Sequence, residues 1–179
     1  MTFFRTIVTW LMALHGLALY AGESVPPAPE DVADSFFIAL TGNWDGRAIE
    51  TPVGPVDYDI SFHVCTDLVI AGVAELSVSD HFWRFWKDNG ELRLTFLSTF
   101  RGNQQPTQLL VSKIDGNTIW FYAPELNLLT LSVAMPDPHV DIRVFHHHEP
   151  HVHIRLTRPD NRLAEAAGEG DIEKSCRKL

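Results

Sequence analysis

Length, composition and charge already exclude several classes of protein. The chain has 179 residues, a length usual for one domain, and its 45% hydrophobic content is too high for an intrinsically disordered protein. Its 14 Lys and Arg are outnumbered by 23 Asp and Glu, which gives a net charge of -9. Because a nucleic-acid-binding protein needs a basic face, we expect a globular domain that binds no nucleic acid.

Residues 1–21 have the pattern of a secretory signal peptide. Arg5 supplies the positive start, residues 7–20 are mostly apolar, and the small residues Ala21 and Gly22 suit cleavage. A membrane anchor or a buried helix is the alternative, but the run is short for a membrane span. No later segment reaches the roughly 18 apolar residues that a span needs. We therefore expect an exported protein without a membrane span after cleavage.

Export bears on the two cysteines of the chain. Cys65 and Cys176 both lie after the expected signal peptide, and an oxidising compartment would let them form a disulfide. Such a bond would join the C-terminal tail to the body of the fold. The alternative is two separate thiols.

A linker and a short helix precede the main domain. Residues 22–30 are rich in proline, which fits neither a helix interior nor a central strand. Val32, Phe36 and Leu40 then recur near helical spacing, so we expect a short amphipathic helix over residues 31–40. Gly42 is expected to end it.

After Gly42 the hydrophobic pattern has a period of two, as in half-buried strands. Residues 56–64 show it most clearly, because apolar side chains alternate there with polar ones. Turn sequences such as Asp88-Asn89-Gly90 and Asp115-Gly116-Asn117 separate the runs. The expected strands are 44–51, 56–65, 68–77, 80–87, 91–100, 106–114, 118–123, 127–134, 139–147 and 151–158.

These strands follow one another with short turns and no helix between them. We therefore predict an all-β fold, an up-and-down antiparallel barrel of about ten strands, since closure removes the exposed edges of so large a sheet. A two-sheet sandwich is the alternative, but it needs longer crossing connections. The barrel domain is placed at 31–158. A C-terminal tail follows at 159–179, in which 160–167 could form a short helix.

Gly42-Asn43-Trp44 opens the first expected strand directly after the helix. A Gly-x-Trp at this place resembles the calycins, the superfamily of lipocalins and fatty-acid-binding proteins. The resemblance implies a barrel around a ligand, with Trp44 closing its floor. In lipocalins a basic residue near the last strand packs across this tryptophan, which makes Arg155 or Arg158 the candidate here.

A narrower resemblance concerns the two ends of the expected barrel. Residues 42–46 together with 150–156 look like the ends of nitrobindin-type ferric-haem barrels, which have ten strands. Those barrels carry an axial histidine in their last strand, in a similar Pro/Met-His-Leu context. This resemblance implies haem as cofactor and His151 as its iron ligand.

Histidines are concentrated at the expected hairpin tip between the last two strands. His146 and His148 share one face of the chain, as do His151 and His153, because residues i and i+2 of a strand point the same way. Neutral imidazole is the commonest metal ligand, so these four residues could bind zinc or copper. The alternative is an exposed segment without a function, since ordinary alternation places His151 and His153 on the outer face.

Aromatic residues are frequent on the expected strands, and strand 80–87 carries them on both faces. One face could line an apolar cavity, whereas plain core packing is the alternative. Arg84 shares a face with Phe82 and Trp86, so we expect it inside, where a guanidinium could hold a ligand carboxylate. The expected lining residues are Phe62, Phe82, Arg84, Trp86, Phe96 and Trp120.

Enzyme motifs do not stand out. The sequence lacks Gly-x-Ser-x-Gly, His-Glu-x-x-His, a phosphate-binding glycine loop and a dinucleotide fingerprint. Acid–base chemistry by His81, His151 and Asp57 or Asp59 is conceivable, but their spacing does not single it out. We expect a non-catalytic, exported binding protein for a fatty acid, an isoprenoid or haem. A zinc- or copper-binding protein and an enzyme acting inside the barrel are the alternatives.

Overall fold

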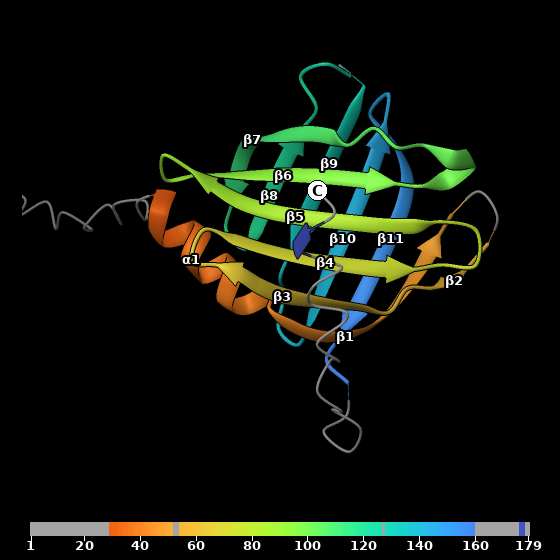
Figure 1. The fold of residues 1–179 in the computed structure, drawn as a ribbon, viewed down its shortest axis with the longest axis horizontal. Helices are drawn as coiled ribbons and strands as arrows, with labels where there is room; N and C mark the ends of the chain where they lie inside the picture. The colour runs from red at the N-terminus through yellow and green to blue at the C-terminus, as the bar shows by residue number, and fades with distance from the viewer. Residues whose placement is uncertain (1–28, 52–53, 127, 160–175, 178–179) are drawn as a thin grey trace, which may run out of the picture.

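The protein is an all-β barrel with one helix across one end (Figure 1). The computed structural model describes residues 29–51, 54–126, 128–159 and 176–177, so the expected signal peptide, most of the linker and the expected helix at 160–167 lie outside it. Its elements are α1 Pro29–Leu40, β1 Gly42–Glu50, β2 Val56–Asp57, β3 Ile60–Thr66, β4 Val69–Glu75, β5 Asp80–Asp88, β6 Glu91–Ser98, the 3-10 turn Phe100–Gly102, β7 Thr107–Asp115, β8 Thr118–Tyr122, β9 Leu129–Ala134, β10 His139–His146 and β11 Glu149–Thr157.

The predicted barrel is confirmed. Antiparallel strands follow one another round a single sheet, and β11 pairs with β1 to close it. Ten strands form the closed barrel, and the two-residue β2 is an extra strand paired with β1. The closing pair excludes the alternative of a two-sheet sandwich. No helix of the described chain is long and apolar enough to cross a membrane.

The expected strand 56–65 is interrupted at Tyr58 and Asp59. Both parts keep one register with β1, but the Gly46 amide donates to the side chain of Asp59 rather than continuing the backbone ladder. Gly46 is needed here because a Cβ atom at this position would lie 2.0 Å from the carbonyl oxygen of Tyr58. This close approach is a contact between two segments, which the alternating pattern does not reveal.

Helix α1 covers one end of the barrel with its apolar face. Ala33, Phe36, Phe37 and Leu40 are buried at the i, i+3, i+4 and i+7 spacing of an amphipathic helix. The Phe36 ring packs edge-on against Phe85, with centroids 4.9 Å apart. The helix begins at Pro29, two residues before the expected start, which is compatible with proline because the first turn needs no intrahelical N–H donor.

Trp44 and Arg158 join α1 to the first and last strands. The indole Nε1 of Trp44 donates to the Leu40 carbonyl at 2.7 Å, and the Arg158 guanidinium lies 3.8 Å from the centre of the indole ring. Arg158 also donates to the carbonyls of Ala39 and Thr41 at the C-terminal end of α1. The basic residue across the tryptophan is therefore Arg158. The assignment to Arg155 is wrong, because this side chain lies on the outer face and bonds Asp141.

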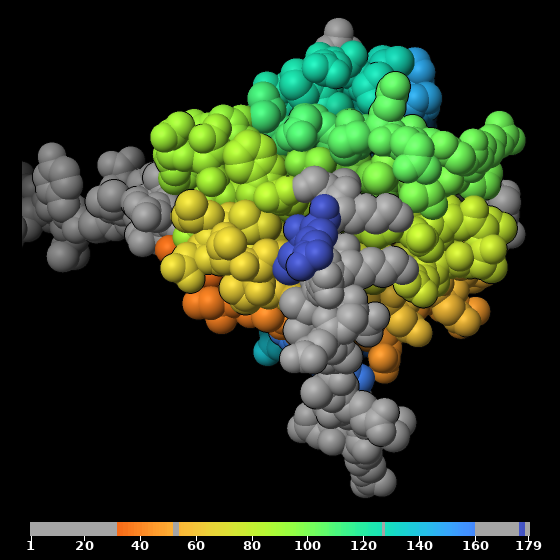
Figure 2. Space-filling model, viewed as in Figure 1, coloured from red at the N-terminus to blue at the C-terminus, as the bar shows by residue number. Residues whose placement is uncertain are grey.

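The predicted disulfide is confirmed. Cys65 and Cys176 are bonded, with their Cα atoms 5.6 Å apart. Cys65 lies on the outer face of the barrel, and Cys176 and Arg177 rest over the outside of the neighbouring strands (Figures 1 and 2). The bond therefore fixes the C-terminal end to the outer wall, over 111 residues of sequence.

Candidate functional site

The strand register decides which side chains face the barrel interior. Residues directly opposite each other in an antiparallel pair point to the same face. Trp83 pairs with Gly72 and Phe96, and Phe85 pairs with Ile70 and Leu94, all of which lie on the inner side with the buried core. The interior face of β5 is therefore the one that carries Trp83 and Phe85.

Four of the six expected lining residues lie on the outer face instead. Phe82, Arg84 and Trp86 alternate with Trp83 and Phe85 and thus point outward. The expectation of an interior Arg84 was wrong because β5 is aromatic on both faces, so alternation alone could not say which face is inside. Trp120 also points outward, where its ring stacks on Phe145 at 5.6 Å.

Phe62 and Phe96 do face inward, but at different depths. Phe62 is fully buried in the core, whereas Phe96 is half-buried and contacts Trp83 at 4.5 Å between ring centroids. Phe96 lies towards the end of the barrel opposite α1, which we call the mouth. The half-buried apolar side chains that turn inward at the mouth are Val56, Leu76, Phe96, Leu129, Val144 and Val152.

A chain of three polar groups lies below these side chains. The indole Nε1 of Trp83 donates to the Tyr58 hydroxyl at 2.8 Å, and this hydroxyl lies 2.9 Å from Nδ1 of His81. Tyr58 and Trp83 are buried, and His81 is half-buried with its ring edge-on to Phe96. The polar chain therefore runs from the core to the mouth and ends on His81.

The hydrogen bonds of Trp83, Tyr58 and His81 favour one tautomer of the neutral imidazole. An indole N–H can only donate, so Tyr58 accepts from Trp83 and has its own proton left to give. The described acceptor for that proton is Nδ1 of His81, which leaves the proton of the neutral imidazole on Nε2. Nε2 lies 3.4 Å from the Ser79 hydroxyl at the mouth.

The shifted pKa values of His81 and Tyr58 agree with both side chains being uncharged at neutral pH. Burial lowers the pKa of His81 to about 4, although the nearby Asp80 carboxylate partly opposes this shift. Burial also raises the pKa of Tyr58, and the hydrogen bond from Trp83 only partly offsets that rise. At neutral pH the mouth thus presents an uncharged imidazole whose Nε2–H can donate to a ligand.

The histidines at the β10–β11 turn do not converge. His153 is buried and bonds Asp141 through Nε2 at 2.7 Å, while His146, His148 and His151 are exposed. The rings of His146 and His151 are 6.3 Å apart, and no three His, Cys, Asp or Glu side chains of the described chain are placed to hold a metal ion. Zinc or copper binding here stays a prediction.

The described residues do not fit haem bound through His151. The register between β10 and β11 shifts at Val144 and Phe145, which leaves His151 as an extra residue in β11. This bulge does not turn the ring into the barrel, because His151 remains exposed. Haem ligation by His151 stays a prediction without support from the side-chain positions.

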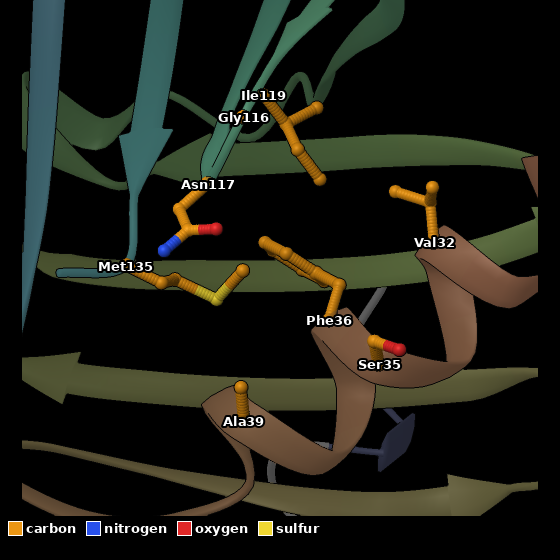
Figure 3. A pocket seen from close by; sticks show the side chains of 8 residues that line it. All are labelled: Val32, Ser35, Phe36, Ala39, Gly116, Asn117, Ile119 and Met135. Atoms are coloured by element: carbon orange, nitrogen blue, oxygen red, sulfur yellow. The ribbon is translucent and has the colours of Figure 1, made fainter. Parts of the chain in front are cut away.

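A hollow of about 350 Å³ lies at the opposite end of the barrel, beside α1 (Figure 3). Phe36 and Ile119 are fully buried side chains in its wall, and Ser35 and Asn117 contribute polar groups. The close-up shows α1 on one side and Asn117 and Met135 on the other. The buried Phe36 ring in the wall of this hollow packs against the buried Phe85 of the core, so the hollow is separate from the mouth.

A smaller groove of about 220 Å³ lies on the outer face of β8, β9 and β10. Trp120, Asp141, Arg143 and Phe145 are among the residues that line it. Burial would raise the pKa of Asp141, but hydrogen bonds from Arg155 and His153 outweigh it and hold the pKa below its usual range. These bonds keep the Asp141 carboxylate ionised and already paired.

Neither a protein-family model nor a curated protein sequence matches the chain. The ten-stranded barrel with its short helix is consistent with a calycin-like fold. His81 was expected only as a conceivable acid–base residue, and its partners Tyr58 and Trp83 were not expected at all. Alternation offered no signal for these contacts, because β5 is aromatic on both faces and Tyr58 lies in the break between β2 and β3. The 23- and 25-residue separations also hid them.

Proposed function

We propose that the protein is an exported binding protein that holds an apolar or amphipathic small molecule at the mouth of its barrel. The observation that carries this proposal is the combination of half-buried apolar side chains at the mouth with one uncharged hydrogen-bonding group, His81, among them. Small-molecule sites in proteins have this composition, with a mostly apolar lining and a few placed polar groups. Barrels of this size hold one ligand in the same region.

The two ends of the barrel differ in a way that favours the mouth. At the α1 end, Phe36, Leu40 and Trp44 are buried, and the Lys87 side chain forms an ion pair with Asp34 of the helix. At the mouth, the inward side chains keep part of their surface exposed, as Val32, Val111 and Met135 do beside α1, but no α-helix of the described chain covers them. A ligand entering there buries apolar surface that is otherwise in contact with water, and this burial stabilises the complex.

Export and calycin membership are part of the proposal. The disulfide between Cys65 and Cys176 supports a protein that folds in an oxidising compartment. The contact of Arg158 with Trp44 supports the calycin resemblance. Expression with residues 1–21 in place, followed by mass analysis of the exported protein, is expected to show a chain that starts near residue 22.

Two space-filling variants test the site of binding. The probe is Nile red, an uncharged dye whose fluorescence rises in apolar surroundings. Val152→Trp fills the mouth, and Ala39→Trp fills the hollow beside α1 as the matched control. We expect Val152→Trp to weaken dye binding at least about tenfold, a change of about 1.4 kcal/mol, and Ala39→Trp to leave it unchanged. No saturable binding to the parent protein, or loss only in Ala39→Trp, would overturn the proposal.

A further inference from the structure

We propose that the ligand presents an uncharged hydrogen-bond acceptor, such as an amide, ester or ketone oxygen, to Nε2–H of His81, and that the site discriminates against carboxylates. This inference rests on the proposed function and names the chemical class of its ligand. It departs from the sequence-based expectation of a fatty acid held by Arg84. Three features of the described chain carry it.

The first feature is the lack of a cation on the inner wall. Over the described strands, no arginine faces inward, and Lys87 is the one inward lysine. Lys87 lies at the α1 end, where it pairs with Asp34. Arg84, the expected anchor, faces outward. A carboxylate taken from water into this interior would find no opposite charge, and burying an unpaired charge costs far more than burying a hydrogen-bonded neutral group.

The second feature is the direction of the hydrogen bond that the mouth offers. Because Tyr58 gives its proton to Nδ1, His81 keeps its proton on Nε2 and can donate from it. The partner at this nitrogen is the Ser79 hydroxyl, whose 3.4 Å separation is long for a hydrogen bond. An acceptor oxygen of a ligand can replace that weak contact with a shorter one. The Ser79 hydroxyl can also rotate to donate to the same oxygen.

The third feature is the charge around the mouth. The described strand ends and turns on this side carry Glu50, Glu75, Asp80, Glu125 and Glu149 against one arginine, Arg101. Their summed field repels an approaching anion and leaves an uncharged molecule unaffected. Desolvation inside and repulsion outside therefore act against a carboxylate in the same direction.

Matched ligands of one chain length test the inference. Decanamide, methyl decanoate and decanoic acid are titrated at pH 7.5 against Nile red bound to the parent protein. We expect decanamide and methyl decanoate to displace the dye at concentrations at least about tenfold lower than decanoic acid. Equal or tighter binding of decanoic acid would overturn the inference while leaving binding at the mouth intact. Absence of Nile red binding would instead overturn the proposed function.

Three variants test the role of His81. His81→Phe removes the donor and is expected to weaken decanamide binding about tenfold. His81→Gln keeps a side-chain N–H and is expected to retain most of it. Arg84→Gln, on the outer face, is the control and is expected to change nothing. Unchanged decanamide binding in His81→Phe, or a loss in Arg84→Gln equal to that in His81→Phe, would contradict the assignment. If His81→Phe does not fold, the matched ligands on the parent protein decide alone.

Discussion

Two residues show how much of this barrel depends on single side chains. Arg158 satisfies the last carbonyls of α1 and covers the Trp44 ring at once, so it joins three parts of the chain. A cation is also favourable at the C-terminal end of a helix. Burial lowers the pKa of Arg158, but an arginine side chain in a protein remains charged throughout the accessible pH range. At the mouth, His81 is the last member of the hydrogen-bond series that runs from Trp83 through Tyr58.

Replacing Arg158 by Ala is expected to lower the free energy of unfolding by about 2 to 3 kcal/mol, because a cation–π contact and two hydrogen bonds are lost. Arg155→Ala is the matched control, since Arg155 is likewise an exposed arginine but bonds Asp141 on the outer face and does not contact Trp44. Its cost is expected to stay below about 1 kcal/mol. Urea unfolding of both variants measures the difference. Equal losses would show that the Trp44 contact does not hold the barrel end.

The low pKa of His81 predicts how stability depends on pH. The folded pKa of about 4 lies below the value of 6.5 in the unfolded chain, so the unfolded chain binds the extra proton first. The stabilisation is complete above pH 6.5 and is lost as the pH falls towards 4, by roughly 3 kcal/mol. The groups facing this ring are Tyr58, Ser79, Asp80 and Phe96.

Unfolding measured between pH 4 and 7 checks this prediction. His81→Gln is expected to flatten the pH dependence, whereas His139→Gln, a partly exposed surface variant, is expected to retain it. A parent protein that is equally stable at pH 7 and pH 4.5 would contradict the buried, neutral state of His81.

At the scale of elements, the order and limits of the strands could be predicted from the sequence. Which side chains of each strand point into the barrel could not. Alternation and the Asp-Asn-Gly and Asp-Gly-Asn turns place hairpins close to where β5–β6 and β7–β8 have them. Strand β5 carries aromatic residues on both of its faces. The alternating pattern therefore does not show which face points into the barrel. The mouth depends on that choice, which is why Arg84 was placed inside and Trp83 was not.

The break between β2 and β3 provides a test at this scale. Gly46→Ala is expected to destabilise the protein by about 3 kcal/mol or more, because its Cβ would meet the Tyr58 carbonyl and backbone must shift. Gly90→Asn is the control: this glycine has open space around it, and asparagine tolerates its left-handed φ of 82°. Thermal unfolding of the two variants compares them. A Gly46→Ala protein as stable as Gly90→Asn would contradict the close approach.

At the scale of the whole molecule, closure of the sheet and one disulfide hold distant parts of the chain together. The pairing of β11 with β1 joins the two ends of the barrel, and the Cys65–Cys176 bond adds a covalent link across 111 residues. The sequence supported both, the first through the number of meandering strands and the second through the count of two cysteines. The polar chain below the mouth has no such sequence signal.

Removing both cysteines, by Cys65→Ser with Cys176→Ser, is expected to lower the free energy of unfolding by about 4 to 5 kcal/mol, since a long loop is released in the unfolded chain. The barrel itself is expected to persist, because the Cys65 side chain lies outside the core. Guanidinium unfolding and far-UV circular dichroism measure the two effects. A loss below about 1 kcal/mol would mean that the bond contributes little to stability.

The most direct test of binding at the mouth is a titration of the protein with decanamide, followed by NMR on the histidine ring nitrogens and the Met135 methyl group. We predict a saturable shift of Nε2 of His81, with His139 and Met135 unchanged, because the ligand oxygen accepts from His81. Met135 lines the hollow beside α1 and therefore reports on the other end of the barrel. A saturable shift at Met135 with His81 unchanged, or no saturable shift at either residue, would contradict the account.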